Sequence, residues 1–160
     1  MADKTSISVW LFLKDGKNKG KIVLQKRSPH ETSFPYICQA TWAGKVEPGE
    51  LIENAIVREC REELGEDFAG KFYFDSLKLV SKQEFARDGK RWESYNYIDN
   101  VEEEVLGLAK MHDMAFSDFV FVGKGDEFFS LKSGKRPEKY VVLFDDQFEV
   151  LKTIFNKKWK

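Results

Sequence analysis

Glu59, Glu62 and Glu63 have the spacing that places carboxylates on one side of a helix. Residues three and four positions apart are neighbours on a helix surface, where like charges destabilise the helix by about 0.2–0.5 kcal/mol per pair. The flanking Arg58 and Arg61 relieve part of this repulsion. A divalent cation would relieve more of it, because Mg²⁺ is a hard ion that prefers carboxylate oxygens and water. The pattern therefore predicts either a cation site or, as for most acidic runs, a solvated helix face.

The residues around these glutamates predict one amphipathic helix that follows a glycine-rich turn. The turn covers residues 44–49, and the helix is expected over residues 51–64, with Gly65 as its C-terminal cap. One stripe of this helix can be buried, because apolar side chains recur four positions apart, at Ile52, Ile56, Cys60 and Leu64.

The spacing of the whole segment resembles the Nudix box of the Nudix hydrolase family, G-x5-E-x7-R-E-U-x-E-E-x-G-U, in which U is a bulky apolar residue. Its seven fixed letters are matched, in order, by Gly44, Glu50, Arg58, Glu59, Glu62, Glu63 and Gly65. Cys60 is acceptable at the first U, whereas Glu66 stands at the second, where an apolar residue is usual. The segment Gln25-Lys26-Arg27 and Trp42, upstream of the box, also resemble the family.

The resemblance implies an α/β fold, namely a Nudix-type α/β/α sandwich with a central mixed β-sheet, formed as a single domain by residues 1–160. The implied activity is metal-dependent hydrolysis of a phosphoanhydride bond in a nucleoside diphosphate linked to another moiety. The implied cofactor is Mg²⁺ or Mn²⁺. Its ligands would be Glu59, Glu62, Glu63 and a backbone carbonyl at Gly44 or Ala43.

Catalytic roles follow from the same resemblance for Glu59 and Glu62, with Glu50 and Arg58 supporting them by bracing the loop and the helix. The general base is left open between a glutamate of the box and an acid on a separate loop. The loop candidates are Glu102, Glu103, Glu104 and Asp118, and His112 is a weaker candidate that titrates near neutrality.

Substrate contacts are expected from basic and aromatic side chains. Arg27 and Lys45, together with Lys26, are candidates for binding phosphate. Stacking on a nucleobase is expected from an aromatic ring, although core or sheet packing explains any one of them as well. The aromatic candidates are Phe34, Trp92, Tyr95 and Tyr97.

Two other functions remain open. The segment 25–50 also resembles isopentenyl diphosphate isomerases of the Nudix type, which have a catalytic cysteine directly before the loop glycine. Ala43 stands at that position, and Cys38 lies several residues too early, so the sequence favours the hydrolase. The second alternative is a non-catalytic nucleotide-binding regulator on the same fold, against which the complete box argues.

The composition sets limits on the partners. The chain has 160 residues, is 42 % hydrophobic and 33 % charged, and has a formal net charge of −1, so nothing indicates nucleic acid or an anionic membrane as a partner. Two cysteines form no disulfide framework, and the first residues lack the apolar core of a signal peptide. We therefore expect a cytoplasmic monomer or homodimer that binds a small nucleotide or diphosphate.

Patterns of apolar residues and turns predict the other elements. Strands are expected over residues 7–13, 21–27, 39–42, 72–84, 91–101 and 119–122, with a hairpin turn at Asp88-Gly89. Residues 102–110 are expected to form a loop or short helix, and residues 126–131 a helical turn. A last helix is expected to begin at Asp145 or Asp146. Its apolar stripe would consist of Phe148, Leu151, Phe155 and Trp159.

Overall fold

The computed structural model describes residues 2–110 and 116–158. In chain order, the strands among these residues are β1 Lys4–Leu13, β2 Ile22–Arg27, β3 Cys38–Gln39, β4 Trp42–Lys45, β5 Lys78–Arg87, β6 Lys90–Val101, β7 Phe116–Val122, β8 Phe129–Ser130 and β9 Val142–Leu143. The helices are α1 Ile52–Leu64, α2 Glu66–Lys71, α3 Glu103–Leu106 and α4 Asp145–Lys158, and short 3₁₀ turns cover Phe74–Ser76 and Leu131–Ser133. Of these helices, none is both long and apolar enough to cross a membrane.

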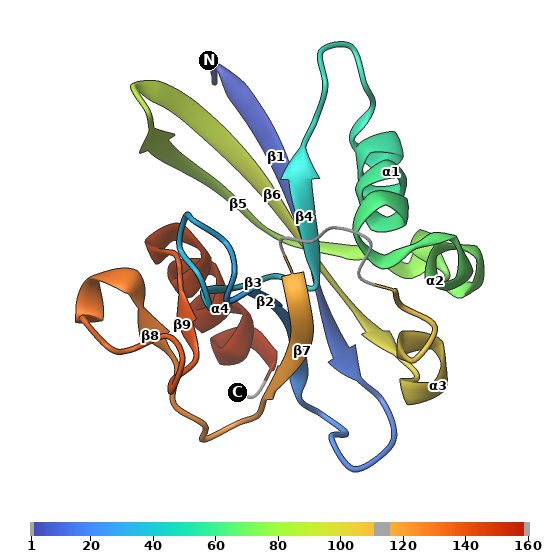
Figure 1. Ribbon diagram of the computed structural model, residues 1–160. Coiled ribbons are helices and arrows are strands. Elements are labelled where there is room, and N and C mark those ends of the chain that lie inside the picture. Colours follow the sequence, from blue (N-terminus) through green and yellow to red (C-terminus); the bar gives the residue numbers. More distant parts are fainter. Residues whose placement is uncertain (1, 111–115, 159–160) are drawn as a thin grey trace.

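One mixed sheet contains all nine described strands, and β1 is its central strand (Figure 1). The principal order is β5-β6-β1-β2-β3-β9-β8, with β4 added to β1 and β7 added to β2. β1 runs parallel to β6, whereas its other edge divides between two antiparallel partners. Residues 6–9 pair with β4, and Leu11 and Phe12 pair with β2. Among the described strands β4 pairs only with β1, so its outer edge stays open.

Successive residues of β1 point to opposite faces of the sheet. Both faces carry apolar side chains, and helices cover each of them. Ile7 and Val9 join the core beneath α1 and α2, whereas Trp10 and Phe12 join the core beneath α4. These side chains are at most 1 % exposed. Burying an aliphatic or aromatic side chain of this kind contributes about 1.5–3 kcal/mol. The predicted α/β/α sandwich with a central mixed sheet is thereby confirmed (Figure 1).

Two of the predicted elements are wrong. The strand expected from residue 72 begins only at Lys78, and a helix, α2, and a 3₁₀ turn precede it. Phe72 and Phe74 pack edge-on against Trp42 beneath α1, so their apolar character serves the core and not a strand. The helical turn expected over residues 126–131 is replaced by β8, which pairs with β9.

The strand expected over residues 39–42 is two short strands, β3 and β4, which pair with different neighbours. α4 begins at Asp145, as predicted, and its inner face contains Phe148, Leu151 and Phe155. Trp159, the last member of the predicted stripe, lies outside the described residues.

Candidate active site

The loop and helix of the box form as the sequence predicts. α1 covers Ile52–Leu64, and Gly65 follows it with a φ of +88°, a backbone conformation that glycine adopts readily. Gly49 has a φ of +78° in the preceding loop for the same reason. Glu66 is the first residue of α2 and forms an ion pair with Arg61 at 3.3 Å. Phe68, the next apolar residue of α2, is fully buried.

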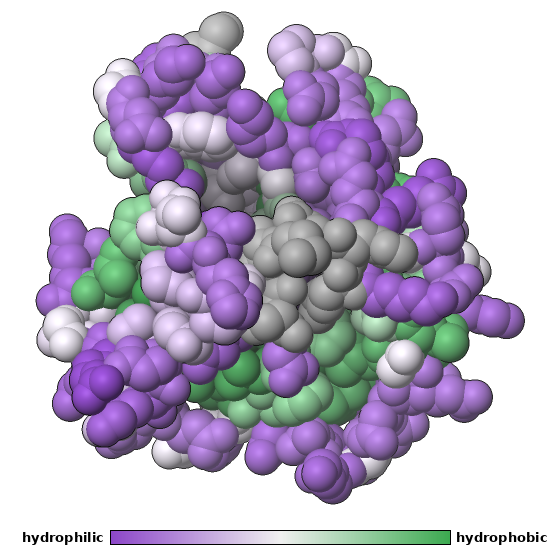
Figure 2. Space-filling view, in the orientation of Figure 1, coloured by the Kyte–Doolittle hydropathy of each residue, from purple (hydrophilic) through white to green (hydrophobic). Residues whose placement is uncertain are grey.

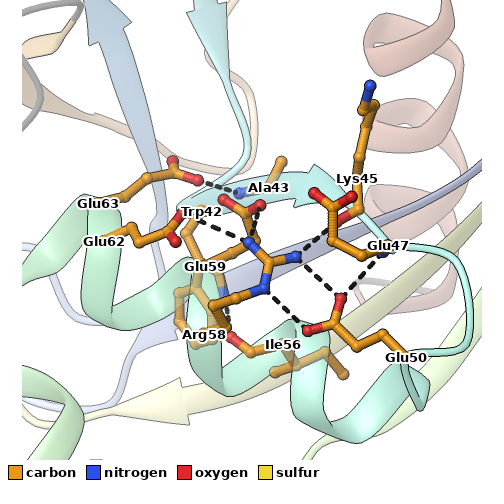
Figure 3. Close-up of polar contacts among 10 residues, drawn as sticks. All are labelled: Trp42, Ala43, Lys45, Glu47, Glu50, Ile56, Arg58, Glu59, Glu62 and Glu63. Carbon is orange, nitrogen blue, oxygen red and sulfur yellow. Dashed lines mark hydrogen bonds and ion pairs between the residues drawn. The ribbon is translucent and has the colours of Figure 1, made fainter.

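Arg58 connects the helix to the loop and to β4 (Figure 3). Its Nε and Nη2 donate to the two carboxylate oxygens of Glu50 at 2.8 and 2.9 Å, and Nη2 also donates to the carbonyl of Lys45 at 2.9 Å. Its Nη1 donates to Glu59 at 2.8 Å. The Arg58 guanidinium lowers the pKa of Glu50 to about 2, with help from the Glu47 amide. The bracing role expected of Glu50 and Arg58 agrees with this geometry.

Gly44 leaves space for the Glu59 side chain. A Cβ atom at Gly44 would lie 2.5 Å from Cγ of Glu59 and closer still to its carboxyl group. Among the described residues, no neighbouring atom lies within 4 Å of the corresponding position at Gly49. The two box glycines therefore act differently: Gly44 permits close approach, and Gly49 permits a left-handed backbone.

Glu63 is the most buried carboxylate of the cluster, with 7 % of the residue exposed. Its Oε1 accepts a hydrogen bond from Nε2 of Gln25 at 3.0 Å, and its Oε2 accepts one from the amide of Ala43 at 3.4 Å. Burial raises the pKa of Glu63 well above its ordinary value, and the nearby charge of Glu59 raises it further. Burial also raises the pKa of Glu59, although Arg58 opposes that change. The structure thus places two carboxylates, Glu59 and Glu63, next to each other in a partly desolvated site.

Glu62 is the exposed member of the cluster and shares the Nη1 donor of Arg58 with Glu59. Its side chain is 58 % exposed, and its carboxylate accepts a weak hydrogen bond from Arg58 at 3.4 Å (Figure 3). Within residues 2–110 and 116–158, no three acidic, histidine or cysteine side chains converge in the manner of a formed metal site.

The register of β4 decides which backbone carbonyl faces these carboxylates. The amide of Val46 donates to the carbonyl of Thr5 on β1. Hydrogen-bonded pairs alternate along an antiparallel ladder, so Gly44, opposite Ile7, also directs its carbonyl toward β1. Ala43 and Lys45 therefore direct their backbone groups to the open edge, where Glu63 and Arg58 bind them. Of the two alternatives that the sequence leaves open, Ala43 presents its carbonyl on the side of the carboxylates.

A cleft of about 210 Å³ lies beside β4, on the face of the sheet that α4 covers. Its lining includes Lys45 and the stacked rings of Phe85 and Trp92, whose centroids are 6.0 Å apart. The Arg87 guanidinium lies 5.1 Å from the Phe85 centroid and 5.8 Å from that of Phe144. In Figure 2 the surface is hollowed between the β5–β6 hairpin and the loop before α1.

The expected phosphate-binding residues differ in their surroundings. Lys45 is exposed and lines the cleft. Arg27, at the end of β2, donates instead to Glu31 at 3.1 Å and to the carbonyl of Ser33, and thereby braces its own loop. Lys26 lies 5.7 Å from the ring centroid of Tyr36. The structure therefore brings Lys45 to the cleft, where its amine has no ion-pair partner among the described residues. Arg27 is not brought to the cleft.

Of the aromatic candidates, Trp92 lines the cleft, and Phe34, which is 52 % exposed, packs on Phe144 at its rim. Tyr95 and Tyr97 pack against the core beneath α1, on the opposite face of the sheet. The alternation of β6 separates them from Trp92.

The candidate loop acids are mostly distant from the carboxylate pair. Glu102 binds Lys14 at 3.2 Å, and the Glu103 amide donates to Asp15, so both lie at the far end of β1. Gly44 lies opposite Ile7, and seven residues of strand to Lys14 span roughly 20 Å. Glu104 lies on α3 at the same end. Asp118 is opposite Lys26 in the sheet, and the alternation of β7 directs its side chain to the face opposite to that of Gln25. His112 lies outside the described residues.

Sequence reasoning missed three contributors. Gln25 binds Glu63, and Arg87 and Phe144 line the cleft. For Gln25 a signal was present, since it is a polar residue after the apolar run of Ile22, Val23 and Leu24. For the other two no local signal existed, because β5 and α4 meet at the cleft only in the folded chain.

Comparisons with known proteins agree with the box and the fold. The model of the NUDIX domain matches residues 4–140. A nucleoside triphosphatase, NudI of Escherichia fergusonii, is 30 % identical over 124 residues, which cover 69 % of this chain and 78 % of that protein. An isopentenyl-diphosphate Delta-isomerase of Mycolicibacterium vanbaalenii is 41 % identical over 60 residues, which cover 38 % of this chain but only 31 % of the isomerase.

Among solved structures, the NUDIX domain of Shewanella oneidensis NrtR, complexed with ADP ribose, superposes with a TM-score of 0.63 at 12 % identity. The superposition covers 98 % of this chain and 89 % of that one, and at this identity it supports the fold alone. The family model and the NudI relative each cover more than two thirds of the chain, and the seven fixed residues of the box are present in the geometry described above. This chain is therefore a member of the Nudix hydrolase family.

Proposed function

We propose that the protein hydrolyses a phosphoanhydride bond in a nucleoside diphosphate linked to another moiety, and that Mg²⁺ or Mn²⁺ is its cofactor. The observation that supports this proposal most is the pair of neighbouring carboxylates, Glu59 and Glu63, at the open edge of β4. Two adjacent acids that are largely withdrawn from water have raised pKa values, and a cation between or beside them would favour their ionised forms.

The donor set fits such a cation. Within the described residues Glu63 has no basic ion-pair partner, so its charge is balanced only by hydrogen bonds. The available donors are hard oxygen atoms, which Mg²⁺ and Mn²⁺ prefer. In this proposal Glu59, Glu62, Glu63 and the carbonyl of Ala43 hold the cation. When bound, the cation supplies neutralisation of phosphate oxygens and acidification of a water molecule.

The other residues of the box hold these donors in place. Arg58 donates to Glu50 through Nε and Nη2 and to the Lys45 carbonyl through Nη2, so it fixes α1 relative to β4. Through Nη1 it also orients the Glu59 carboxylate. Glu50 and Arg58 are thus positioning residues. For the general base we propose a box glutamate, Glu62, whose exposed carboxylate is the most accessible of the cluster.

The cleft beside β4 suits the nucleoside part of the substrate. Phe85 and Trp92 offer flat apolar surfaces, and Ser6, Ser8 and Ser94 add hydroxyl groups along the sheet. Lys45 lines this cleft, and we propose that it contacts a phosphate of the substrate. The ADP-ribose complex of the NrtR domain and the name of the NudI relative are consistent with a nucleotide ligand.

Isomerase chemistry is less well supported. Ala43 has no thiol, and both cysteines are buried. Burial raises the pKa of Cys38 to about 11 and also raises that of Cys60, so neither thiol ionises near neutral pH. We also propose that the protein acts in a reducing cytoplasm, because both cysteines are unpaired. We propose that it is a monomer or homodimer.

A substrate screen tests the proposal. Nucleotide sugars, dinucleotides, nucleoside triphosphates and prenyl diphosphates are incubated with the protein and Mg²⁺, and phosphate is measured with and without added phosphatase. We expect nucleotide products whose phosphate appears only after phosphatase treatment, and no product in excess EDTA. Full turnover in EDTA would contradict the cofactor, and isomerisation of a prenyl diphosphate without hydrolysis would contradict the reaction.

A further inference from the structure

Gln25 is a fully buried polar residue in β2. It is 0 % exposed, and its neighbours along the strand on the N-terminal side, Val23 and Leu24, are buried and apolar. Glutamine is seldom completely buried, because its amide must then find partners inside the protein. The burial of a glutamine at this position therefore needs an explanation.

The hydrogen bonds of Gln25 fix the orientation of its amide. Nε2 donates to the carbonyl of Thr41 and to Oε1 of Glu63, the latter at 3.0 Å. The Thr41 carbonyl can only accept a hydrogen bond, so the NH₂ end must face it, and the same group then donates to Glu63. Both hydrogens of the amide are thereby used. The opposite end, Oε1 of Gln25, is buried and has no hydrogen-bond partner among the described residues.

Among the described residues, only the NH₂ end of the Gln25 amide has hydrogen-bond partners. The donor end of Gln25 is fully engaged, whereas its acceptor end carries an unsatisfied buried oxygen, which costs folding stability. An apolar side chain in this strand would avoid the unpaired oxygen. A residue that costs stability in this way is typical of positions kept for function, and here the useful part is the N–H group that points at Glu63.

We propose that Gln25 is a positioning residue for the cation site and that its Nε2 holds the Glu63 carboxylate in the orientation that binds the cation. Carboxylates that ligate metals are usually held by hydrogen bonds from residues behind them, and loss of such a partner lowers metal affinity or activity about 10- to 100-fold. Thr41 acts behind Gln25 in turn, since its carbonyl, in the connection between β3 and β4, accepts the second hydrogen. The inference rests on the proposed function, because it requires a cation at Glu63.

Mn²⁺ titration by calorimetry tests the inference on the purified full chain. Gln25→Met keeps the length of the side chain and removes the donor. Gln25→Asn keeps an amide but shortens it, so that it cannot reach Thr41 and Glu63 together. We expect Mn²⁺ affinity about 10- to 100-fold below wild type in both variants. The rise in melting temperature that Mn²⁺ causes should also shrink, because stabilisation of the folded state by a ligand grows with the logarithm of its affinity.

Asn96→Leu is the matched control for loss of a buried amide. Asn96 is 0 % exposed, accepts a hydrogen bond from Trp10 at 3.2 Å, and belongs to the α4 side of the sheet. Its replacement should lower the melting temperature without changing the Mn²⁺ affinity. At saturating Mn²⁺, and with rates normalised to the folded fraction of each protein, the Gln25 variants should lose kcat while KM for the substrate changes little.

The outcomes separate the inference from the function on which it rests. If wild type binds Mn²⁺ and a folded Gln25→Met or Gln25→Asn protein binds it equally well, Gln25 is only a structural residue and the inference is wrong. If wild type does not bind Mn²⁺ at all, the cation site itself is wrong and both proposals are lost. Should Gln25→Met fail to fold, Gln25→Asn, which retains a polar amide, still decides the question.

Discussion

Replacement of Gly44 by alanine should disable the enzyme through one misplaced carboxylate. The new Cβ atom would lie 2.5 Å from Cγ of Glu59, whereas ordinary contacts begin at 3.4 Å. The Glu59 side chain must therefore retreat by about 1 Å, and a displacement of that size near the reacting groups costs about 100-fold in rate. That factor corresponds to about 2.7 kcal/mol of transition-state stabilisation.

Glu59 cannot avoid the new methyl group without losing a contact. Its Oε1 accepts a hydrogen bond from Arg58 at 2.8 Å, and Arg58 is itself held by Glu50 and the Lys45 carbonyl. The side chain is only 14 % exposed. We expect the free energy of unfolding to fall by about 1 kcal/mol, at the lower end of the range for overpacking, because a side chain rather than backbone must move.

The assay is kcat/KM with saturating Mg²⁺ on the best substrate from the screen, run beside thermal melts. Gly70→Ala is the matched control, since Gly70 lies in α2 and no atom comes within 4 Å of its added Cβ. That variant should keep wild-type activity and gain stability, by up to about 1 kcal/mol for alanine over glycine inside a helix. A folded Gly44→Ala protein with kcat/KM within about threefold of wild type would refute the reasoning.

Further predictions concern the carboxylates and the thiols. Glu63→Gln should lower turnover by about two orders of magnitude or more and reduce the Mg²⁺-induced rise in melting temperature. Glu53→Gln, at an exposed position of α1, should keep both the turnover and the rise in melting temperature. Equal turnover in the two variants would show that the cluster is only a solvated helix surface. The double variant Cys38→Ser/Cys60→Ser should melt at a lower temperature but keep its turnover, and loss of turnover in the folded protein would revive the isomerase alternative. The pKa of Glu50 is lowered from 4.5 to about 2 in the folded protein, so its ion pair with Arg58 stabilises the fold fully above the higher value and is lost as pH falls through the lower one. The difference in melting temperature between wild type and Glu50→Gln should therefore be constant near neutral pH and shrink in acid, and a difference that persists to about pH 2 would contradict this explanation.

The helix of the box, α1, was predictable because its information is local. Spacing of four residues sets the buried stripe of Ile56, Cys60 and Leu64, and the same period places Glu59 next to Glu63. Glycine at position 65 ends the helix because its φ of +88° is disfavoured for other residues. Each of these features depends on neighbours within one or two helical turns.

The errors and omissions have a common physical origin. Phe72 and Phe74 have the composition of a strand, but Trp42, thirty residues earlier, offers them a packing partner. β8 forms because β9 lies beside it, not because of its own sequence. The periodicity of apolar residues and their β-propensity reflect local conformational preference, which packing between distant segments can override.

By itself the sequence determined the family, the fold class and the box helix with its cluster of glutamates. Only the tertiary structure decided how those residues are directed. The pairing of β4 with β1 directs the Gly44 carbonyl toward β1 and leaves that of Ala43 on the side of the carboxylates. Because β1 pairs with β4 and β2 at different residues, the outer edge of β4 stays open to α1. It likewise brings Gln25 behind Glu63 across 38 positions of the chain. Such directions follow from strand register, which is set by contacts between distant segments and is not encoded in any one of them.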